Sequence, residues 1–171
     1  RTYGLEDSLT IWADEDMLDK ICFNLLSNAM KFTPAGGKVE FGLDVISREE
    51  ALKFFDLGDK DVDSRYMKVV VKDTGPGIPE NQLERIFDRY YQLENQMRGV
   101  YNWGTGIGLY FAKTLARMHH GYLKAGNRDE GTGAAFTLLL PISESSYADS
   151  EKVQLEVKDD NCPYIVSSVK Y

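Results

Sequence analysis

Three polar residues stand in a row within an otherwise amphipathic stretch near the N-terminus. Asn24, Asn28 and Lys31 lie at i, i+4 and i+7, so on a helix they fall within about a 60° arc, away from the apolar face. Asparagine is a poor helix residue because its side chain competes for backbone hydrogen bonds. Two amide oxygens and an ammonium suit a Mg²⁺ ion and the phosphates that it bridges. A solvated polar face is the alternative that this pattern alone leaves open.

A second cluster begins where an apolar stretch ends, at the sequence Asp73-Thr-Gly-Pro-Gly-Ile-Pro79. Gly75 and Gly77 allow the backbone to approach a flat ligand or to adopt positive φ. Asp73 is a carboxylate that accepts hydrogen bonds only, and a buried carboxylate needs a donor such as an exocyclic amino group. A tight turn capped by Asp73 is the alternative.

The third cluster is Gly104-Thr-Gly-Ile-Gly108, which opens an expected helix. Free backbone amides and the helix dipole both favour an anion at such a place. The spacing matches neither the dinucleotide fingerprint nor the P-loop, so by itself the signal is weak. Together the three clusters offer an amino-group acceptor, a ledge for Mg²⁺ and phosphate, and an anion nest. These are the parts of an ATP site.

The elements that must position these residues follow from the spacing of apolar residues. Asp14 is a good N-cap for a helix that ends at Thr33-Pro34. The apolar face of that helix contains Leu18, Ile21, Cys22, Leu25, Leu26 and Ala29. We also expect strands over 9–13, 39–45, 66–72, 122–125 and 134–140, and helices over 47–55, 80–87 and 109–119, the last capped by Gly121. This order predicts an α+β, two-layer α/β sandwich with a mixed, mostly antiparallel sheet and helices packed on one face.

Composition excludes several classes of protein. The 171 residues contain 20 basic and 27 acidic side chains, for a net charge of −7. No apolar run approaches the roughly 20 residues of a membrane helix, and two cysteines cannot build a disulfide framework. A pI of about 4.9 argues against nucleic-acid binding. The whole excess of acid lies in residues 44–63 and 142–171, which we interpret as a solvated insertion and a solvated tail.

The clusters resemble the sequence boxes of the ATP-binding catalytic domain of two-component sensor histidine kinases, in the gyrase/Hsp90/histidine kinase/MutL superfamily. Asn24-Leu-Leu-Ser-Asn28-Ala-Met-Lys31-Phe-Thr-Pro34 is similar to the N box and Asp73–Pro79 to the G1 box. Ile86-Phe-Asp-Arg-Tyr90 resembles the F box, and Gly104–Leu109 the G2 box. The resemblance runs from about residue 11 to 141 with the boxes in order, and it implies the Bergerat fold.

The resemblance also implies roles for individual residues. Asp73 would bind the adenine amino group, and Asn28 would hold Mg²⁺ with Asn24 close by, while Lys31 would contact phosphate. We take Asn24, Asn28 and Lys31 as the catalytic candidates. The remaining nucleotide-binding candidates are Gly75, Gly77, Ile78, Arg89, Arg98, Thr105, Gly106, Gly108 and Leu109. The domain would span 1–141, with an insertion at about 44–63 and an ATP lid at about 91–104, before an acidic linker or extension over 142–171.

Two departures from the family pattern leave alternatives open. Gln92 stands where many members have Arg, so Lys31, Arg89 and Arg98 are the cations left for the terminal phosphate. Ala134 and Ala135 precede Phe136, where many members carry a hydroxyl residue. His119 and His120 lie in the last turn of a helix, where a cation near the helix C-terminus is the plain interpretation.

The predicted function is to bind Mg-ATP and to transfer the γ-phosphate to a histidine on a separate dimerisation domain of the parent kinase. A degenerate nucleotide-binding docking module, or a serine kinase or ATPase of the same superfamily, is the alternative. The resemblance implies a response regulator or a fused receiver domain as the further partner. We expect a monomeric, cytoplasmic domain without nucleic-acid or membrane contact, whose parent is anchored in the bacterial inner membrane.

Overall fold

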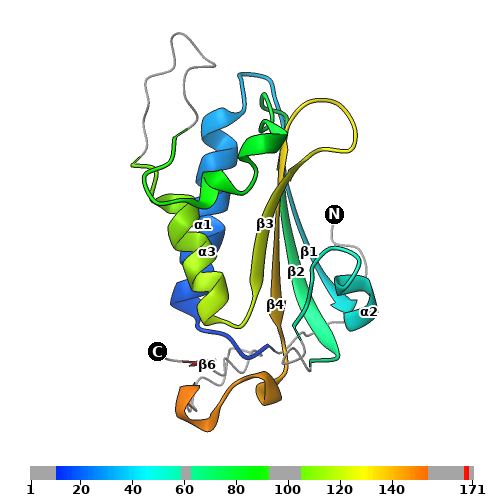
Figure 1. Ribbon diagram of the computed structural model, residues 1–171, viewed down its shortest axis with the longest axis vertical. Coiled ribbons are helices and arrows are strands. Elements are labelled where there is room, and N and C mark those ends of the chain that lie inside the picture. Colours follow the sequence, from blue (N-terminus) through cyan, green and yellow to red (C-terminus); the bar gives the residue numbers. More distant parts are fainter. Residues whose placement is uncertain (1–10, 59–62, 93–104, 154–167, 170–171) are drawn as a thin grey trace, which may run out of the picture.

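The computed structural model describes residues 11–58, 63–92, 105–153 and 168–169. Its centre is a four-stranded sheet built from β1 (Val39–Ser47), β2 (Arg65–Asp73), β3 (Tyr122–Asn127) and β4 (Ala134–Pro141). The strands lie in the order β1-β2-β4-β3, and each neighbouring pair is antiparallel. The predicted α+β fold is confirmed, and the described strands of this sheet contain antiparallel pairs alone (Figure 1).

Two helices, α1 (Glu15–Phe32) and α3 (Gly108–Met118), cover one face of the sheet (Figure 1). The Asp14 side chain caps α1 by accepting a 3.0 Å hydrogen bond from the Met17 N–H, as predicted. Ile21, Leu25 and Ala29 are fully or almost fully buried in the main core cluster. Each buried side chain of the size of Leu stabilises the fold by about 1.5–3 kcal/mol. The apolar face therefore fixes α1 on the sheet, with its polar row to one side.

The strand register brings the ends of several strands together at one end of the sheet, measured along the strand direction. β2 ends where β1 and β4 begin, and β3 ends beside the start of β4. The terminal pairs are Val39 with Asp73, Lys72 with Ala135, and Asn127 with Ala134. The loops that leave these ends therefore lie close together.

The segment after β1 covers the opposite face of the sheet. Ser47 caps the short helix α2 (Arg48–Ala51), with a reciprocal bond from the Ser47 N–H to Glu50. A second core cluster joins Ala51, Phe55 and Leu57 to Ile46, Tyr66 and Leu139. The expected solvated insertion is therefore wrong over these residues, because its apolar side chains pack on the sheet while its acidic ones face water. The prediction that the helices pack on one face of the sheet is confirmed for α1 and α3 but is wrong for α2.

Residues 80–87 do not form the predicted helix. They make two separate 3₁₀ turns, η1 (Glu80–Gln82) and η2 (Arg85–Phe87). Ile86 and Phe87 are adjacent and both buried, whereas the residues around them are exposed or half-buried. The two turns leave Ile86 and Phe87 packed in the main core cluster, and a continuous helix over 80–87 is therefore wrong.

The expected strand over 9–13 is reduced to a single bridge within the described residues. The Trp12 N–H donates to the Ile142 carbonyl over 3.2 Å, and neighbouring Ala13 is buried without strand pairing. Residues 9 and 10 lie outside the described part of the chain.

The end of α3 differs from the prediction in two ways. His120, not Gly121, takes the left-handed conformation with φ 53°, while the Gly121 N–H donates to the Ala116 carbonyl over 2.8 Å. Gly121 is needed because a Cβ there would collide with Leu140 and the Leu139 carbonyl. The first of the two histidines, His119, is fully buried rather than an exposed cation.

His119 joins the two helices that lie on the sheet. Its Nε2 accepts from the Asp14 N–H over 3.0 Å, and its Nδ1 lies 3.1 Å from the Leu115 carbonyl, so Nδ1 carries the proton. Burial lowers the pKa of His119. A neutral imidazole therefore connects the end of α3 to the start of α1.

Residues after β4 pack back on the domain. Ile142 and Tyr147 are buried, and the chain continues through the turns η3 (Glu144–Ser146) and η4 (Asp149–Glu151). Buried Asp63 anchors this segment by accepting from the Ser143 N–H, the Ser143 hydroxyl and the Ser146 hydroxyl at 2.7–2.9 Å. The prediction of a solvated tail is therefore wrong for this segment after β4. The domain boundary at 141 stays a prediction.

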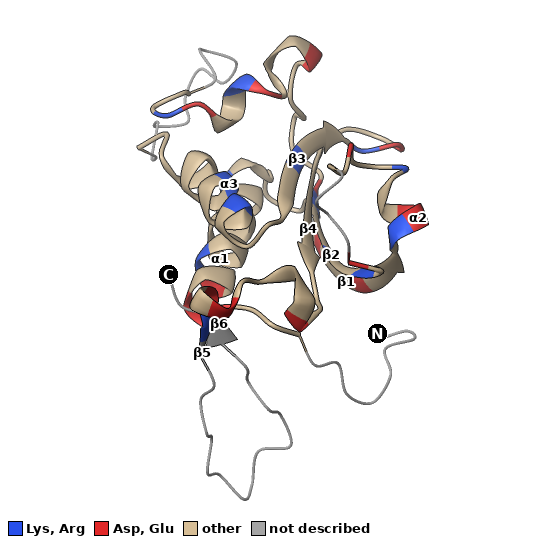
Figure 2. Ribbon diagram, turned by 60° about the horizontal axis from the view of Figure 1, so that its bottom comes forward, with Lys and Arg blue, Asp and Glu red and all other residues tan. Residues whose placement is uncertain are grey.

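The short strands β5 (Lys152–Val153) and β6 (Ser168–Val169) pair beyond this segment. Figure 2 shows acidic residues gathered on the turns beside them. Among the described residues, no helix has the length and apolar character to cross a membrane.

Replacement of Asp63 by Asn should destabilise the domain. Burial would raise the pKa of Asp63, but hydrogen bonds from Ser143, Arg65 and Ser146 outweigh it and hold that pKa below its usual value. An amide presents an N–H₂ group to donors that need an acceptor, at a cost of about 1–3 kcal/mol. Urea unfolding followed by circular dichroism measures this loss. Asp56→Asn, at an exposed acid, is the matched control, and equal losses in the two variants would contradict the anchoring role.

Acidification should weaken the fold through His119. Because its pKa is lowered in the folded state, the unfolded chain binds a proton that the folded chain does not. The contribution of neutral His119 to the free energy of unfolding is complete at pH values above the unfolded pKa of about 6.5. At lower pH it decreases, by up to ~1.4 kcal/mol per pH unit. Urea unfolding at pH 7.5 and 5.5 should show a smaller difference for His119→Gln than for the wild type. The same pH difference in both proteins would refute this assignment.

Candidate nucleotide-binding site

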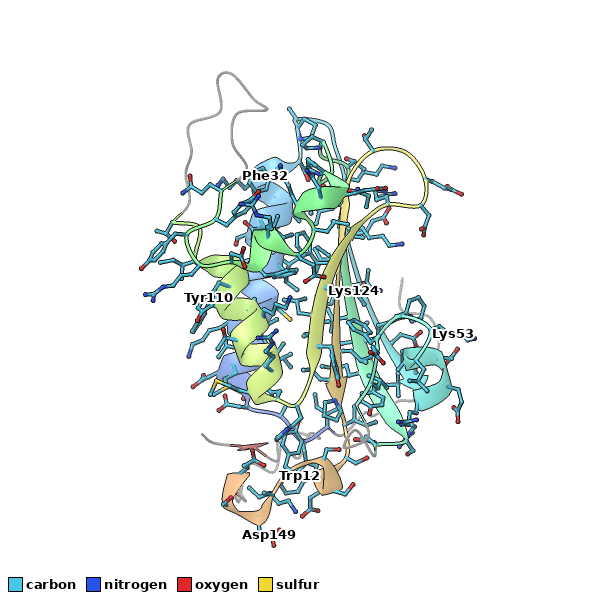
Figure 3. All side chains as sticks on the ribbon, viewed as in Figure 1. Trp12, Phe32, Lys53, Tyr110, Lys124 and Asp149 are labelled. Atoms are coloured by element: carbon cyan, nitrogen blue, oxygen red, sulfur yellow. The ribbon has the colours of Figure 1, made fainter. Side chains whose placement is uncertain are left out.

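A cavity of about 470 Å³ opens at the end of the sheet where the strand ends meet. It lies between the last turns of α1, the loop after β2 and the residues that lead into α3. Ten of the predicted site residues line it: Asn24, Asn28, Lys31, Asp73, Gly77, Ile78, Thr105, Gly106, Gly108 and Leu109. Figure 3 labels Phe32, which also lines the cavity, at this end of α1.

The polar row of α1 forms one wall. The Asn24 amide nitrogen donates to the Lys20 carbonyl over 2.7 Å, so its oxygen is left for other partners. That oxygen faces Gly108, where an added Cβ would lie only 2.6 Å from it. Gly108 therefore leaves room for the Asn24 amide in its present position, and a side chain there would displace it.

Asp73 forms the inner end of the cavity and is 3% exposed. Its Oδ1 accepts from the Gly75 N–H over 2.8 Å and from the Ala134 N–H over 3.2 Å. Among the described residues none donates to its Oδ2, although Asp73 lines the cavity. The free carboxylate oxygen can accept from a ligand amino group. Gly75 itself does not line the cavity, and its role is to hold Asp73.

Asn127 fixes the loop after β2, a role that the sequence did not reveal. Its side chain accepts from the Ile78 N–H and donates to the Ile78 carbonyl, each over 2.8 Å. Gly77, beside it, adopts φ 78°. Asn127 ends β3, far from the loop in sequence, so only the strand register could have identified it.

Residues 105–108 form the opposite end of the cavity and lead into α3. Gly106 adopts φ 68°, and its carbonyl accepts from the Tyr90 N–H over 2.9 Å. A Cβ at Gly106 would lie 2.8 Å from the backbone of Tyr90 and Tyr91. Among the described residues no side chain caps the first turn of α3, so its backbone N–H groups and dipole are available to an anion.

The apolar walls combine residues that the sequence placed at the site, Ile78 and, in the predicted lid, Tyr91, with three that it did not, Ile86, Ala134 and Phe136. Ile86, Tyr91, Ala134 and Phe136 line the cavity together with Ile78. Their types suit a flat ring between the polar ends. Ser27, Pro76 and Gln92 line it as well, and Gln92 belongs to the predicted lid besides being a departure from the family pattern.

The cation that would meet a terminal phosphate is Lys31 among the described residues. Lys31 lines the cavity, with its Nζ 4.8 Å from the Phe32 ring centroid. Arg89 does not reach it; the guanidinium stacks on Tyr90 and lines a second cavity of about 320 Å³ beside α3. Arg98 and the rest of the predicted lid, residues 93–104, lie outside the described residues.

The donor set fits a Mg²⁺ ion only if phosphate completes it. The described residues contain no group of three His, Cys, Asp or Glu side chains that could hold a metal. Mg²⁺ is commonly held by one or two protein oxygens together with substrate phosphates and water. The amide oxygens of Asn24 and Asn28 on the cavity wall are compatible with that mode.

A family profile described as "Histidine kinase-, DNA gyrase B-, and HSP90-like ATPase" matches residues 13–144. Histidine kinase P4 of Formosa agariphila is 30% identical over 169 residues, which cover 95% of this chain and 11% of P4. Sensor histidine kinase WalK of Bacillus subtilis is 35% identical over 141 residues, covering 82% of this chain and 20% of WalK. The chain thus spans a small part of these relatives.

A solved structure shares the fold. Full-length ShkA in complex with AMPPNP superposes with a TM-score of 0.52 and 28% identity, over 74% of this chain and 22% of ShkA. The boxes of the sequence, their meeting at one cavity and these matches agree. The chain belongs to the family of histidine kinase-, DNA gyrase B- and HSP90-like ATPases.

Proposed function

We propose that the chain binds ATP together with Mg²⁺ and transfers the γ-phosphate to a histidine side chain on a separate domain. The observation that carries this proposal is the division of the cavity into two chemically different ends. One end has the free Oδ2 of Asp73 between apolar walls, and the other has Asn24, Asn28, Lys31 and the first turn of α3. A purine and a polyphosphate need such a pair of environments.

Asp73 recognises the base in this proposal. Its Oδ1 is fully used by two backbone N–H groups, which fix the plane of the carboxylate. Its Oδ2 then accepts from the adenine amino group. Ile78, Ile86 and Phe136 remove the faces of the ring from water.

The phosphates lie at the other end. Lys31 and the first turn of α3 supply positive charge, and Asn28 supplies an oxygen ligand for Mg²⁺, with Asn24 close by. The metal, when bound with ATP, neutralises charge that develops on the phosphates. Gly106 allows its backbone to lie against Tyr90 and Tyr91, and Gly108 leaves room for the Asn24 side chain, so that the backbone N–H groups of this segment can face the phosphates.

The cavity is better suited to hold ATP for a protein nucleophile than to activate water. The Asn24 amide cannot take a proton, and a general base is needed to activate water. Among the described residues that line the cavity, Asp73 is the only carboxylate, and none is a histidine. In this proposal the acceptor is a histidine on a separate domain, and the relatives P4 and WalK are both named histidine kinases.

The acceptor is the histidine-bearing dimerisation domain of a longer parent kinase, and a response regulator or a fused receiver domain takes the phosphate next. One relative, from Dictyostelium discoideum, is named a hybrid signal transduction histidine kinase, which supports a receiver domain as a possible neighbour. The proposed location is the cytoplasm, and the isolated domain is a monomer.

Asp73→Asn should abolish most of the nucleotide affinity without unfolding the domain. The Asn oxygen can keep both backbone hydrogen bonds, but its N–H₂ group then faces the adenine amino group as a second donor. Loss of a charge-assisted bond costs about 1.5–3 kcal/mol, so affinity falls at least tenfold. Calorimetric titration with a non-hydrolysable ATP analogue, with Mg²⁺ or EDTA, measures it. Asp56→Asn serves as the control, and wild-type affinity in Asp73→Asn would exclude this base contact.

Asn28→Ala should distinguish a domain that transfers phosphate from one that acts only by docking to a partner. Loss of the metal ligand lowers phosphorylation of an added histidine-bearing domain about 100-fold or more, because the Mg²⁺-phosphate unit is no longer held in place. Asn81→Ala, at an exposed asparagine outside the cavity, should retain activity. Transfer of radioactive γ-phosphate gives the rate. If the wild type binds the acceptor domain but never phosphorylates it, the chain is a docking module and the proposed transfer is wrong.

A further inference from the structure

β1 has one side that the described part of the chain leaves without a partner strand. It lies at the edge of the four-stranded sheet and pairs with β2 alone (Figure 1). Bonds from the Thr74 N–H to the Lys38 carbonyl and from the Arg48 N–H to the Ser64 carbonyl flank the β1–β2 ladder. Antiparallel pairing alternates, so the even-numbered residues of β1 bond to β2 and the odd-numbered ones point their backbone groups outward.

The centre of this outer side offers free backbone groups. The Val45 N–H is already taken by the Asp44 carboxylate over 2.9 Å. Within the described residues, the outward N–H and C=O groups of Phe41 and Leu43 have no protein partner. Phe41 and Leu43 are thus the positions at which another strand can pair.

The free edge lacks the usual features that prevent strand addition. Short length, Pro, Lys or a bulge commonly protect an edge strand. β1 has nine residues in continuous register with β2 and contains neither Pro nor Lys. Phe41 is 50% exposed and Leu43 37% exposed, on the sheet side where Val39 and Val45 pack against the main core. An added strand would therefore bury apolar surface that now faces water.

The opposite side of the same strand is acidic. Glu40 and Asp44 alternate there with Gly42, both acidic residues are exposed, and on β2 they stand opposite Lys72 and Lys68, so the carboxylates form the outermost charged row of this face. Arg128 reaches Glu40 over 3.6 Å, and no ion pair within the described residues includes Asp44. A strand laid along this edge would thus meet apolar residues on one side and carboxylates on the other.

We infer that the free edge of β1 binds an extended segment of a partner protein in which apolar residues alternate with Lys or Arg. Backbone bonds to Phe41 and Leu43 would supply affinity, and the alternation would supply register and specificity. A second copy of β1 is a poorer occupant because it brings further carboxylates instead of cations. This inference does not depend on the nucleotide chemistry proposed above.

Two synthetic peptides of equal composition test it with the full chain. One alternates, acetyl-Lys-Val-Lys-Val-Lys-Val-Lys-amide, and the other places its four Lys before its three Val. Fluorescence anisotropy of labelled peptides should show at least tenfold tighter binding of the alternating one. Amide hydrogen exchange should slow at Phe41 and Leu43 when it binds. Equal affinity of the two peptides, or no protection at β1, would overturn the inference.

A matched pair of variants isolates the backbone contribution. Leu43→Ala and Leu43→Pro both remove the side chain, but only Pro removes the outward N–H, and neither touches a bond to β2. The Leu43→Pro variant should bind the alternating peptide about tenfold more weakly than the Leu43→Ala variant does. Equal affinities would contradict strand addition. Circular dichroism and thermal melting check that both variants fold.

Glu40→Lys tests the charge pattern independently of any proline. It should lower the affinity for the alternating Lys peptide severalfold and raise the affinity for a peptide that alternates Glu with Val. No change in either affinity would contradict the expected basic partner. Light scattering of the free chain should report a monomer, and a dimer that Leu43→Pro dissociates would assign this edge to a second copy instead.

Discussion

The Asp73 carboxylate is the contact on which the arrangement of the site depends. Its Oδ1 accepts backbone hydrogen bonds from Gly75, in the loop after β2, and from Ala134, at the start of β4. These two bonds hold neighbouring strand ends together and orient the side chain. The same two bonds leave Oδ2 without a donor among the described residues at a position that lines the cavity, so one side chain holds the fold and is available to the proposed ligand.

The other half of the site depends on how the two long helices meet. Neutral, buried His119 ties the end of α3 to the N-cap of α1. At the other end of the pair, Gly108 lets the first turn of α3 approach Asn24 closely. The polar row of α1 and the free N–H groups of α3 therefore face one cavity. That juxtaposition supports the proposal that phosphates and their metal lie between the helices.

The acidic segments have different structural roles from those that their charge indicated. Apolar residues within 44–58 form a second core cluster on the far side of the sheet. Asp63 is buried and anchors the chain after β4 through Ser143 and Ser146. The local excess of carboxylates masked these contacts in the sequence, because net charge reports composition and not which side chains face inward. The exposed acids of β1 are, by contrast, the basis of the inferred strand-binding edge.

The sequence predicted the helix α1, its Asp14 cap, most of the strands and the candidate site residues Asn28, Asp73 and Gly108, because caps, apolar periodicity and glycine spacing are local signals. It could not identify Asn127 or Phe136 as parts of the site, or separate Arg89 from it, because those outcomes depend on strand register and helix packing. Residues 80–87 show the same limit: two 3₁₀ turns that place Ile86 and Phe87 in the core stand where the sequence predicted one helix. Tertiary structure decided which distant residues share a cavity, since long-range pairing leaves no local pattern.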